Sequence, residues 1–156
     1  MYRWCGNASE KHLEAAVTDP ATEAIKAFHN WNHAFNARDI TAQLSHMHFP
    51  HVRLAENRFQ AWETGDDFRA GEDVLTKRLK DEGWNHTDTT AIQAVQAGDD
   101  KVHLVIRQSR RHADGVEYHG FDTLWIFTKI DGRWGVQFRS SFLAAASNLS
   151  DGTNRG

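Results

Sequence analysis

Asp122 is the side chain in this sequence whose setting most clearly suggests chemistry. It lies in the middle of residues 116–130, which are predicted to form one long strand, with Phe121 before it and the run Leu124-Trp125-Ile126-Phe127 after it. An ionised carboxylate among apolar side chains is costly unless it is paired or protonated. Asp122 is therefore either a general acid or base in a pocket, or a structural carboxylate bonded to Ser140, Trp31 or a backbone amide.

The histidines form two groups whose spacing could also support chemistry. His46, His48 and His51 lie close together around a helix end, and two of them turned inward could bind a metal or relay a proton. No carboxylate stands nearby, so a solvated or capping role is the favoured interpretation. His29 and His33 share a helix face, but they lie off its apolar stripe and are predicted to be surface residues. No metal site is therefore predicted.

Composition narrows the class of protein. The 156 residues suit one domain, and 40% hydrophobic with 25% charged residues is typical of a globular chain. The formal charge of −3 argues against a dedicated nucleic-acid binder. No apolar run is long enough for a bilayer, and no glycine-rich phosphate loop or other cofactor motif appears. With Cys5 as the one cysteine and no apolar leader, a cytoplasmic protein without a cofactor is expected.

The first part of the chain predicts helices and two short strands. Asp19-Pro20 starts a helix, and an apolar stripe with spacings of three and four follows it. Asp39 can cap a short second helix, and a third is expected over residues 65–82. Short strands are expected over residues 51–55 and 59–63. Residues 1–17 are predicted to be a loose arm, 18–146 one domain and 147–156 a tail.

Four long strands are predicted to complete the domain, over residues 84–97, 101–112, 116–129 and 133–143. Their short, turn-rich connections make them antiparallel neighbours. The predicted fold class is therefore α+β: a curved antiparallel sheet of two short and four long strands, wrapped around three helices. Such a cone is expected to enclose an internal pocket.

Strand alternation assigns side chains to the two faces of this sheet. The sets that hold Leu104, Asp122 and Phe138 are the more apolar and are expected to face the helices. The predicted pocket residues are Phe28, Trp31, Phe35, Val52, Leu54, Leu104, Tyr118, Phe138, Ser140 and Phe142. The other face mixes aromatic side chains with arginine, which is typical of a protein interface. A homodimer is expected through Val105, Arg107, Phe121, Trp125, Phe127, Gln137 and Arg139.

Three short segments carry a family resemblance: the helix end Phe35-Asn36-Ala37-Arg38-Asp39, the run from Gly120 to Phe127, and Gly132-Arg133-Trp134. With the order of elements over residues 20–144, they make the chain similar to the nuclear transport factor 2-like superfamily. That superfamily has a cystatin-like cone and includes SnoaL-like cyclases, ketosteroid isomerase and scytalone dehydratase. The resemblance implies the fold strongly and the function weakly.

Comparison with ketosteroid isomerase implies a partial match of polar residues. Asp122 corresponds to that enzyme's protonated aspartic acid, and Trp31 to its oxyanion-binding tyrosine. Leu54, or a neighbour in residues 52–55, stands where the enzyme has its aspartate base. One of the three polar roles is kept, so steroid isomerisation by the same mechanism is not expected.

Two functions are compatible with the sequence. The first is a SnoaL-like protein that binds a small apolar or aromatic molecule, with Asp122 as the candidate catalytic residue of a cofactor-independent isomerase, cyclase or dehydratase. The second is a non-enzymatic binding or dimerisation module whose cone is filled by its own side chains. A void below a few hundred cubic ångströms would favour the second.

Overall fold

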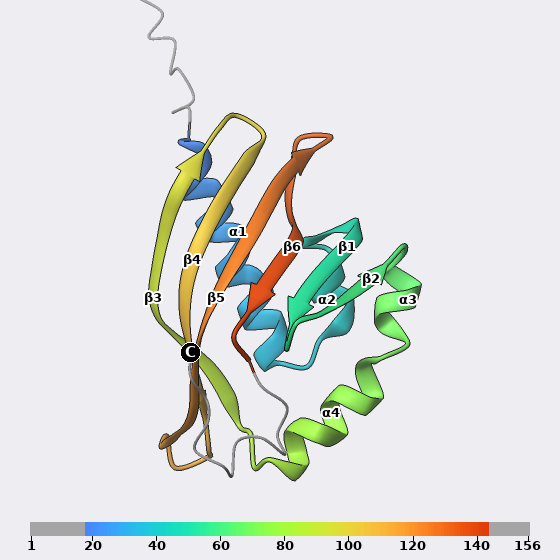
Figure 1. Ribbon diagram of the computed structural model, residues 1–156, viewed down its shortest axis with the longest axis vertical. Coiled ribbons are helices and arrows are strands. Elements are labelled where there is room, and N and C mark those ends of the chain that lie inside the picture. Colours follow the sequence, from blue (N-terminus) through green and yellow to red (C-terminus); the bar gives the residue numbers. More distant parts are fainter. Residues whose placement is uncertain (1–17, 144–156) are drawn as a thin grey trace, which may run out of the picture.

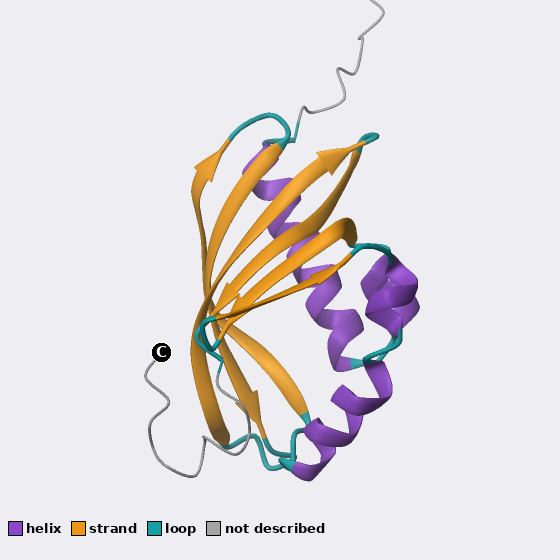
Figure 2. Ribbon diagram, turned by 45° about the vertical axis from the view of Figure 1, so that its right-hand side comes forward, coloured by secondary structure: helices purple, strands orange, loops and turns teal. Residues whose placement is uncertain are grey.

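The computed structural model of the chain describes residues 18–143. The predicted arm at residues 1–17, which contains Cys5, and the predicted tail at residues 147–156 lie outside the described residues. Figure 1 shows a curved sheet with the long first helix running behind its strands. Figure 2 shows the helices gathered on one side of the sheet, so the described residues form an α+β cone.

The helices begin where the sequence places their caps. α1 (Pro20–Asn36) starts after Asp19, whose carboxylate accepts a hydrogen bond from the backbone N–H of Thr22. α2 (Ile40–Leu44) is capped by Asp39 in the same way. The third predicted helix is interrupted at Ala70 and Gly71, and forms α3 (Gly65–Arg69) and α4 (Glu72–Asp81).

The sheet has six strands in the order β2-β1-β6-β5-β4-β3. Their bounds are β1 (Met47–Ala55), β2 (Arg58–Trp62), β3 (His86–Ala97), β4 (Lys101–Arg111), β5 (Glu117–Ile130) and β6 (Arg133–Ser141). All neighbouring strands are antiparallel except β1 and β6, which run parallel. β1 begins before Pro50, earlier than expected, and its register against β6 shifts between Met47 and Val52.

The core lies between α1 and the inner face of the sheet. The apolar stripe of α1 is buried as predicted, and includes Phe28, Trp31 and Phe35. The rings of Phe28 and Trp31 meet the Trp125 ring edge to face, with centroid separations of 5.0 and 4.8 Å. Trp125 therefore belongs to the helix-covered face of β5.

The predicted facing of β5 is wrong. Leu104 of β4 pairs with Trp125, so Phe121, Trp125 and Phe127 share the inner face with Leu104. Asp122 points the other way, where it forms an ion pair with Arg107. The register of β4 with β5 shifts between Arg110 and Arg111, beside the turn. Because a register change of one residue exchanges the two faces of a strand, this shift reverses the predicted facing of β5.

The predicted facing of β6 is right for its first half and wrong for its second. Trp134 and Val136 are buried on the inner face as expected. The pairing of β6 with β5 then shifts: Phe127 pairs with Val136 and Ile126 with Phe138, so β6 has one extra residue between these pairs. Beyond it, Phe138 and Ser140 pair with outer-face residues of β5, and Arg139 and Ser141 turn inward.

The predicted facing of β1 is wrong too, because β1 follows the second half of β6. Val52 pairs with Phe138 and Leu54 with Ser140, so both lie on the outer face. Arg53 and Ala55 take the inward positions.

Candidate functional site

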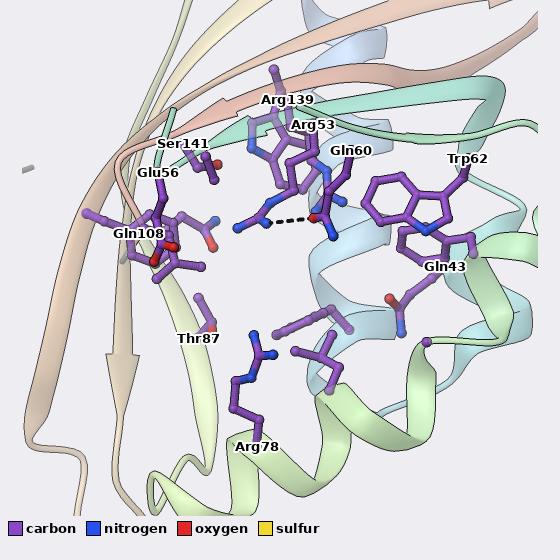
Figure 3. Close-up of a pocket in the computed structure, with 18 of the residues that line it drawn as sticks. Gln43, Arg53, Glu56, Gln60, Trp62, Arg78, Thr87, Gln108, Arg139 and Ser141 are labelled. Carbon is purple, nitrogen blue, oxygen red and sulfur yellow. Dashed lines mark hydrogen bonds between the residues drawn. The ribbon is translucent and has the colours of Figure 1, made fainter. Parts of the chain in front are cut away.

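A pocket of about 760 Å³ lies between the inner face of the sheet, α1 and α4. Its floor is aromatic, with Trp31, Phe35 and Trp125 among the lining residues. Figure 3 shows Arg53 and Arg139 from the sheet on one side, and Arg78 from α4 across the opening. The volume is in the range of small-molecule sites, and the lining combines apolar rings with a few polar groups.

The predicted pocket residues fall into three groups. Trp31 and Phe35 line the pocket. Phe28 and Leu104 are fully buried in the core behind it. The others are not on its wall: Val52, Leu54, Phe138 and Ser140 lie on the outer face, Phe142 is 62% exposed, and the Tyr118 hydroxyl is bonded to Glu82.

Asp122 is placed away from the pocket. Its Oδ1 lies 3.3 Å from Nη1 of Arg107, and its side chain is 48% exposed. The sequence-based reason for a catalytic Asp122 was its burial among apolar side chains. That reason no longer applies, because those side chains face the other way.

The residues predicted for a dimer face are divided between the two sides of the sheet. Val105 and Arg107 do lie on the outer face, where Val105 is 42% exposed. Phe121, Trp125 and Arg139 line the pocket instead, and Phe127 is fully buried in the core. Gln137 accepts a hydrogen bond from the Thr128 hydroxyl at 3.0 Å.

Glu82 is the pocket carboxylate most enclosed by protein. It follows the last residue of α4, and its side chain is 4% exposed. Its Oε2 accepts hydrogen bonds from Nη1 of Arg110 and from the Tyr118 hydroxyl, each at 2.8 Å. Burial, together with the bond to Glu82, raises the pKa of Tyr118, so this hydroxyl stays a donor. The second oxygen, Oε1, is buried and has no hydrogen-bond partner.

Arg139 is a partly buried cation surrounded by aromatic rings. Its Cζ lies 5.4 Å from the ring of Trp125, 5.6 Å from Trp31 and 5.9 Å from Phe68. Its Nε donates to Nε2 of His51 at 2.9 Å. Burial and the neighbouring Arg53 lower the pKa of Arg139 to about 9.

His51 is fully buried, so its predicted solvated or capping role is wrong. Its Nδ1 lies 3.2 Å from the carbonyl oxygen of Val136, and Nε2 accepts from Arg139. This pair of contacts fixes a neutral ring with the proton on Nδ1. Burial and the Arg139 charge lower the pKa of His51 to about 2.

The other histidines do not assemble a metal site. His29 and His33 are exposed as predicted, and His48 is buried with Nδ1 beside the Thr128 hydroxyl at 2.9 Å. Within residues 18–143, no group of three or more His, Cys, Asp or Glu side chains is arranged to hold a metal ion. No helix in that range is long and apolar enough to cross a membrane.

Sequence reasoning missed Arg53, Arg139, Gln43 and Glu82 as pocket residues. Glu82 directly precedes Gly83, where the helix was predicted to stop. Its position at a helix end beside the cone could have identified it as a candidate pocket residue. For Arg139 the sequence offers no such signal, because its facing depends on the extra residue in β6.

The comparisons with known proteins agree with this architecture. The chain belongs to a family of NTF2-like proteins, DUF6841, whose model matches residues 22–138. No curated protein matches the chain significantly.

Several solved structures share the fold at low sequence identity. An NTF2-like protein of unknown function from Shewanella oneidensis MR-1 is 15% identical, with 77% of this chain and 96% of that chain covered and a TM-score of 0.60. An NTF2-like protein with a cystatin-like fold from Novosphingobium aromaticivorans is 14% identical, with 82% and 86% covered and a TM-score of 0.63. A protein from Shewanella frigidimarina, proposed to be a ketosteroid isomerase, is 10% identical, with 76% and 94% covered and a TM-score of 0.61.

Proposed function

We propose that this protein binds a small organic molecule with a ring system in the pocket between α1, α4 and the sheet. The pocket itself carries the proposal: about 760 Å³ lined by Trp31, Phe35, Trp125 and a set of polar groups. This volume is well above the few hundred cubic ångströms below which a cone filled by its own side chains would be favoured. A structural neighbour proposed to be a ketosteroid isomerase is consistent with a ring-shaped ligand.

A screen of small cyclic compounds by thermal shift tests the proposal. Ligands that bind only the folded state stabilise it by RT ln(1 + [L]/Kd), so the unfolding midpoint rises by roughly several degrees when the ligand concentration far exceeds Kd. Ala55→Phe fills the pocket from β1, where Ala55 is 8% exposed and on the wall. The ligand-induced shifts should disappear in this variant.

Val105→Phe is the matched control, because it adds a ring of the same size on the outer face. It should leave the ligand-induced shifts in place. Shifts that survive Ala55→Phe unchanged would place binding outside the cone and overturn the proposal.

A second candidate function is proton transfer without a cofactor, and Glu82 is the observation that favours it. A buried carboxylate oxygen without a partner, in a pocket, is a candidate base for a C–H proton next to a carbonyl. Arg110 and Tyr118 hold the other oxygen, which fixes the orientation of the carboxylate. Asp122 has no part in this candidate, because it lies on the opposite face.

We also propose a homodimer formed through the outer face of the sheet. None of the described helices covers this face (Figure 2), and Val105, Leu124, Ile126 and Phe138 give it apolar side chains. A contiguous apolar surface on a sheet is typical of a contact between subunits.

A further inference from the structure

The inner wall of the pocket carries two arginines that face each other across paired strands. Arg53 and Arg139 are partners in the register of β1 and β6, and both line the pocket. Figure 3 shows the two side chains together at the sheet side of the pocket. Burial, and after it the charge of Arg53, lowers the pKa of Arg139. Burial is also the largest cause that lowers the pKa of Arg53.

Neither arginine forms a salt bridge with a carboxylate among residues 18–143, although the charge of Glu56 raises the pKa of Arg53. Among residues 18–143, the Arg139 side chain makes one hydrogen bond, through Nε, so its two terminal nitrogens have no acceptor within that range. Arg53 makes one bond, from Nη1 to Oε1 of Gln60 at 3.3 Å.

Other enclosed arginines in the same structure are paired. Arg110 meets Glu82 at 2.8 Å and Arg38 meets Glu72 at 2.5 Å, all with side chains no more than 18% exposed. Burying a cation without a counter-charge is costly. Arg53 and Arg139, which form no salt bridge within residues 18–143, are therefore the exception that needs an explanation.

Two more donors on this pocket lack an acceptor. Nε1 of Trp31 and Nε2 of Gln43 are buried without a hydrogen-bond partner, in side chains of residues 4% and 1% exposed. An indole N–H can only donate, and a buried donor without an acceptor is destabilising. Glu82 Oε1 is a buried acceptor on the wall without a hydrogen-bond partner, and it belongs to a formed ion pair.

We propose that Arg139 and Arg53 form an anion subsite for the carboxylate of a cyclic or aromatic acid, which extends the proposed function from a ring to a ring with an acidic group. The two terminal nitrogens of one guanidinium match the two oxygens of a carboxylate. His51 is the positioning residue, since it accepts the hydrogen bond of Arg139 Nε and leaves the two terminal nitrogens of Arg139 for the carboxylate. A monoanion suits this aromatic surrounding better than a strongly hydrated dianion such as phosphate.

The competing explanation is that Arg139 is structural and is satisfied by His51 and the aromatic rings alone. Cation–π contacts are stronger for a desolvated arginine than for an exposed one, so the three rings near Arg139 give this explanation a physical basis. It predicts that the pocket has no preference between an anionic ligand and a neutral ligand of the same shape.

The test compares 2-naphthoate with 2-naphthamide, which differ in charge and hardly in shape. Binding is measured by calorimetry and by quenching of tryptophan fluorescence. The expected result is that the carboxylate binds at least tenfold more tightly than the amide. Arg139→Gln and Arg53→Gln should each reduce the ratio to within a factor of about three, because each removes a cation and keeps polar length.

Arg69→Gln on α3 is the control with the same change in charge, and it should leave the ratio unchanged. If Arg139→Gln does not fold, Arg53→Gln and the wild-type ratio still decide the matter. Equal binding of both probes in the wild type, lost in Ala55→Phe, would overturn the anion subsite and leave the pocket proposal standing. No binding of 2-naphthoate at millimolar concentration also overturns the subsite, while the compound screen decides the pocket proposal separately.

Discussion

Single side chains decide which chemistry this pocket can support. Glu82 lines the pocket and is held by Arg110 and Tyr118 through one carboxylate oxygen, while the other oxygen is buried without a hydrogen-bond partner. Such a carboxylate can accept a proton only from a group that enters the pocket.

Glu82→Gln keeps the shape of the side chain and removes the base. For a cyclic ketone that binds the cone, we expect the wild type to speed deuterium uptake from D₂O at the carbon next to the carbonyl. The variant should be slower by about 10²–10⁴-fold, the usual contribution of a positioned base. Mass spectrometry of the ketone measures the uptake.

Glu72→Gln is the matched control, since Glu72 also lines the pocket but is bonded to Arg38. An uptake rate that falls equally in both variants, or in neither, would remove Glu82 from the candidate mechanism.

The sheet is the element that separates the two proposed activities. Its inner face carries the pocket, and its outer face carries Val105 with Leu124 and Ile126 of β5. Because alternate residues point to opposite faces, a change on one face can leave the other intact. Binding and dimerisation can therefore be tested independently.

Leu124→Asp places a charge in the middle of the outer face. We expect it to turn a dimer into a monomer in light scattering coupled to size-exclusion chromatography, because a buried unpaired charge is incompatible with an apolar interface. Ligand shifts in the cone should persist in the variant. Val116→Asp, at a turn where Val116 is 58% exposed, serves as the control.

A wild-type protein that elutes as a monomer across the micromolar range would contradict the dimer proposal. A dimer that tolerates Leu124→Asp would contradict the choice of face.

Acid should weaken the whole molecule through its buried histidines. Burial is the largest cause that lowers the pKa values of His46, His48, His51 and His119, with His119 at about 4 and His51 at about 2. In the unfolded chain the histidines have a pKa near 6.5, so below that pH the unfolded chain binds more protons than the folded chain. The resulting stability is complete above pH 6.5 and is lost as the pH falls below it.

His51→Gln supplies an acceptor for Arg139 and cannot titrate. Between pH 6 and 4 we expect the free energy of unfolding of this variant to fall less steeply than that of the wild type. The difference should approach one proton, about 1.4 kcal/mol per pH unit. Urea unfolding at several pH values measures it.

His29→Gln, at an exposed position on α1, should show the wild-type slope. A His51→Gln slope equal to that of the wild type would mean that His51 is protonated in the folded state at these pH values.

The architecture could be predicted because its signals are local. Asp19 and Asp39 cap helices whatever the rest of the chain does, the apolar stripe with Phe28, Trp31 and Phe35 needs a core to cover it, and short turns make strands neighbours. These features, with the superfamily resemblance, were enough for the α+β cone.

The site could not be predicted to the same degree, because its residues depend on strand register. Asp122 and Trp125 are three positions apart, so they lie on opposite faces of β5. The register shift beside the β4–β5 turn therefore decides which of them faces the pocket. Arg139 reaches the pocket only because β6 has an extra residue opposite Ile126 and Phe127.

Taken by itself, the sequence determined the kind and order of the elements, apart from the break between α3 and α4, and predicted a hollow beneath the sheet. The tertiary structure alone decided that the hollow is lined by arginines and Glu82, and that Asp122 lies outside it. The physical reason is that helix caps and apolar periodicity act within a few residues, whereas the face of a strand is set by hydrogen bonds to a neighbour far along the chain.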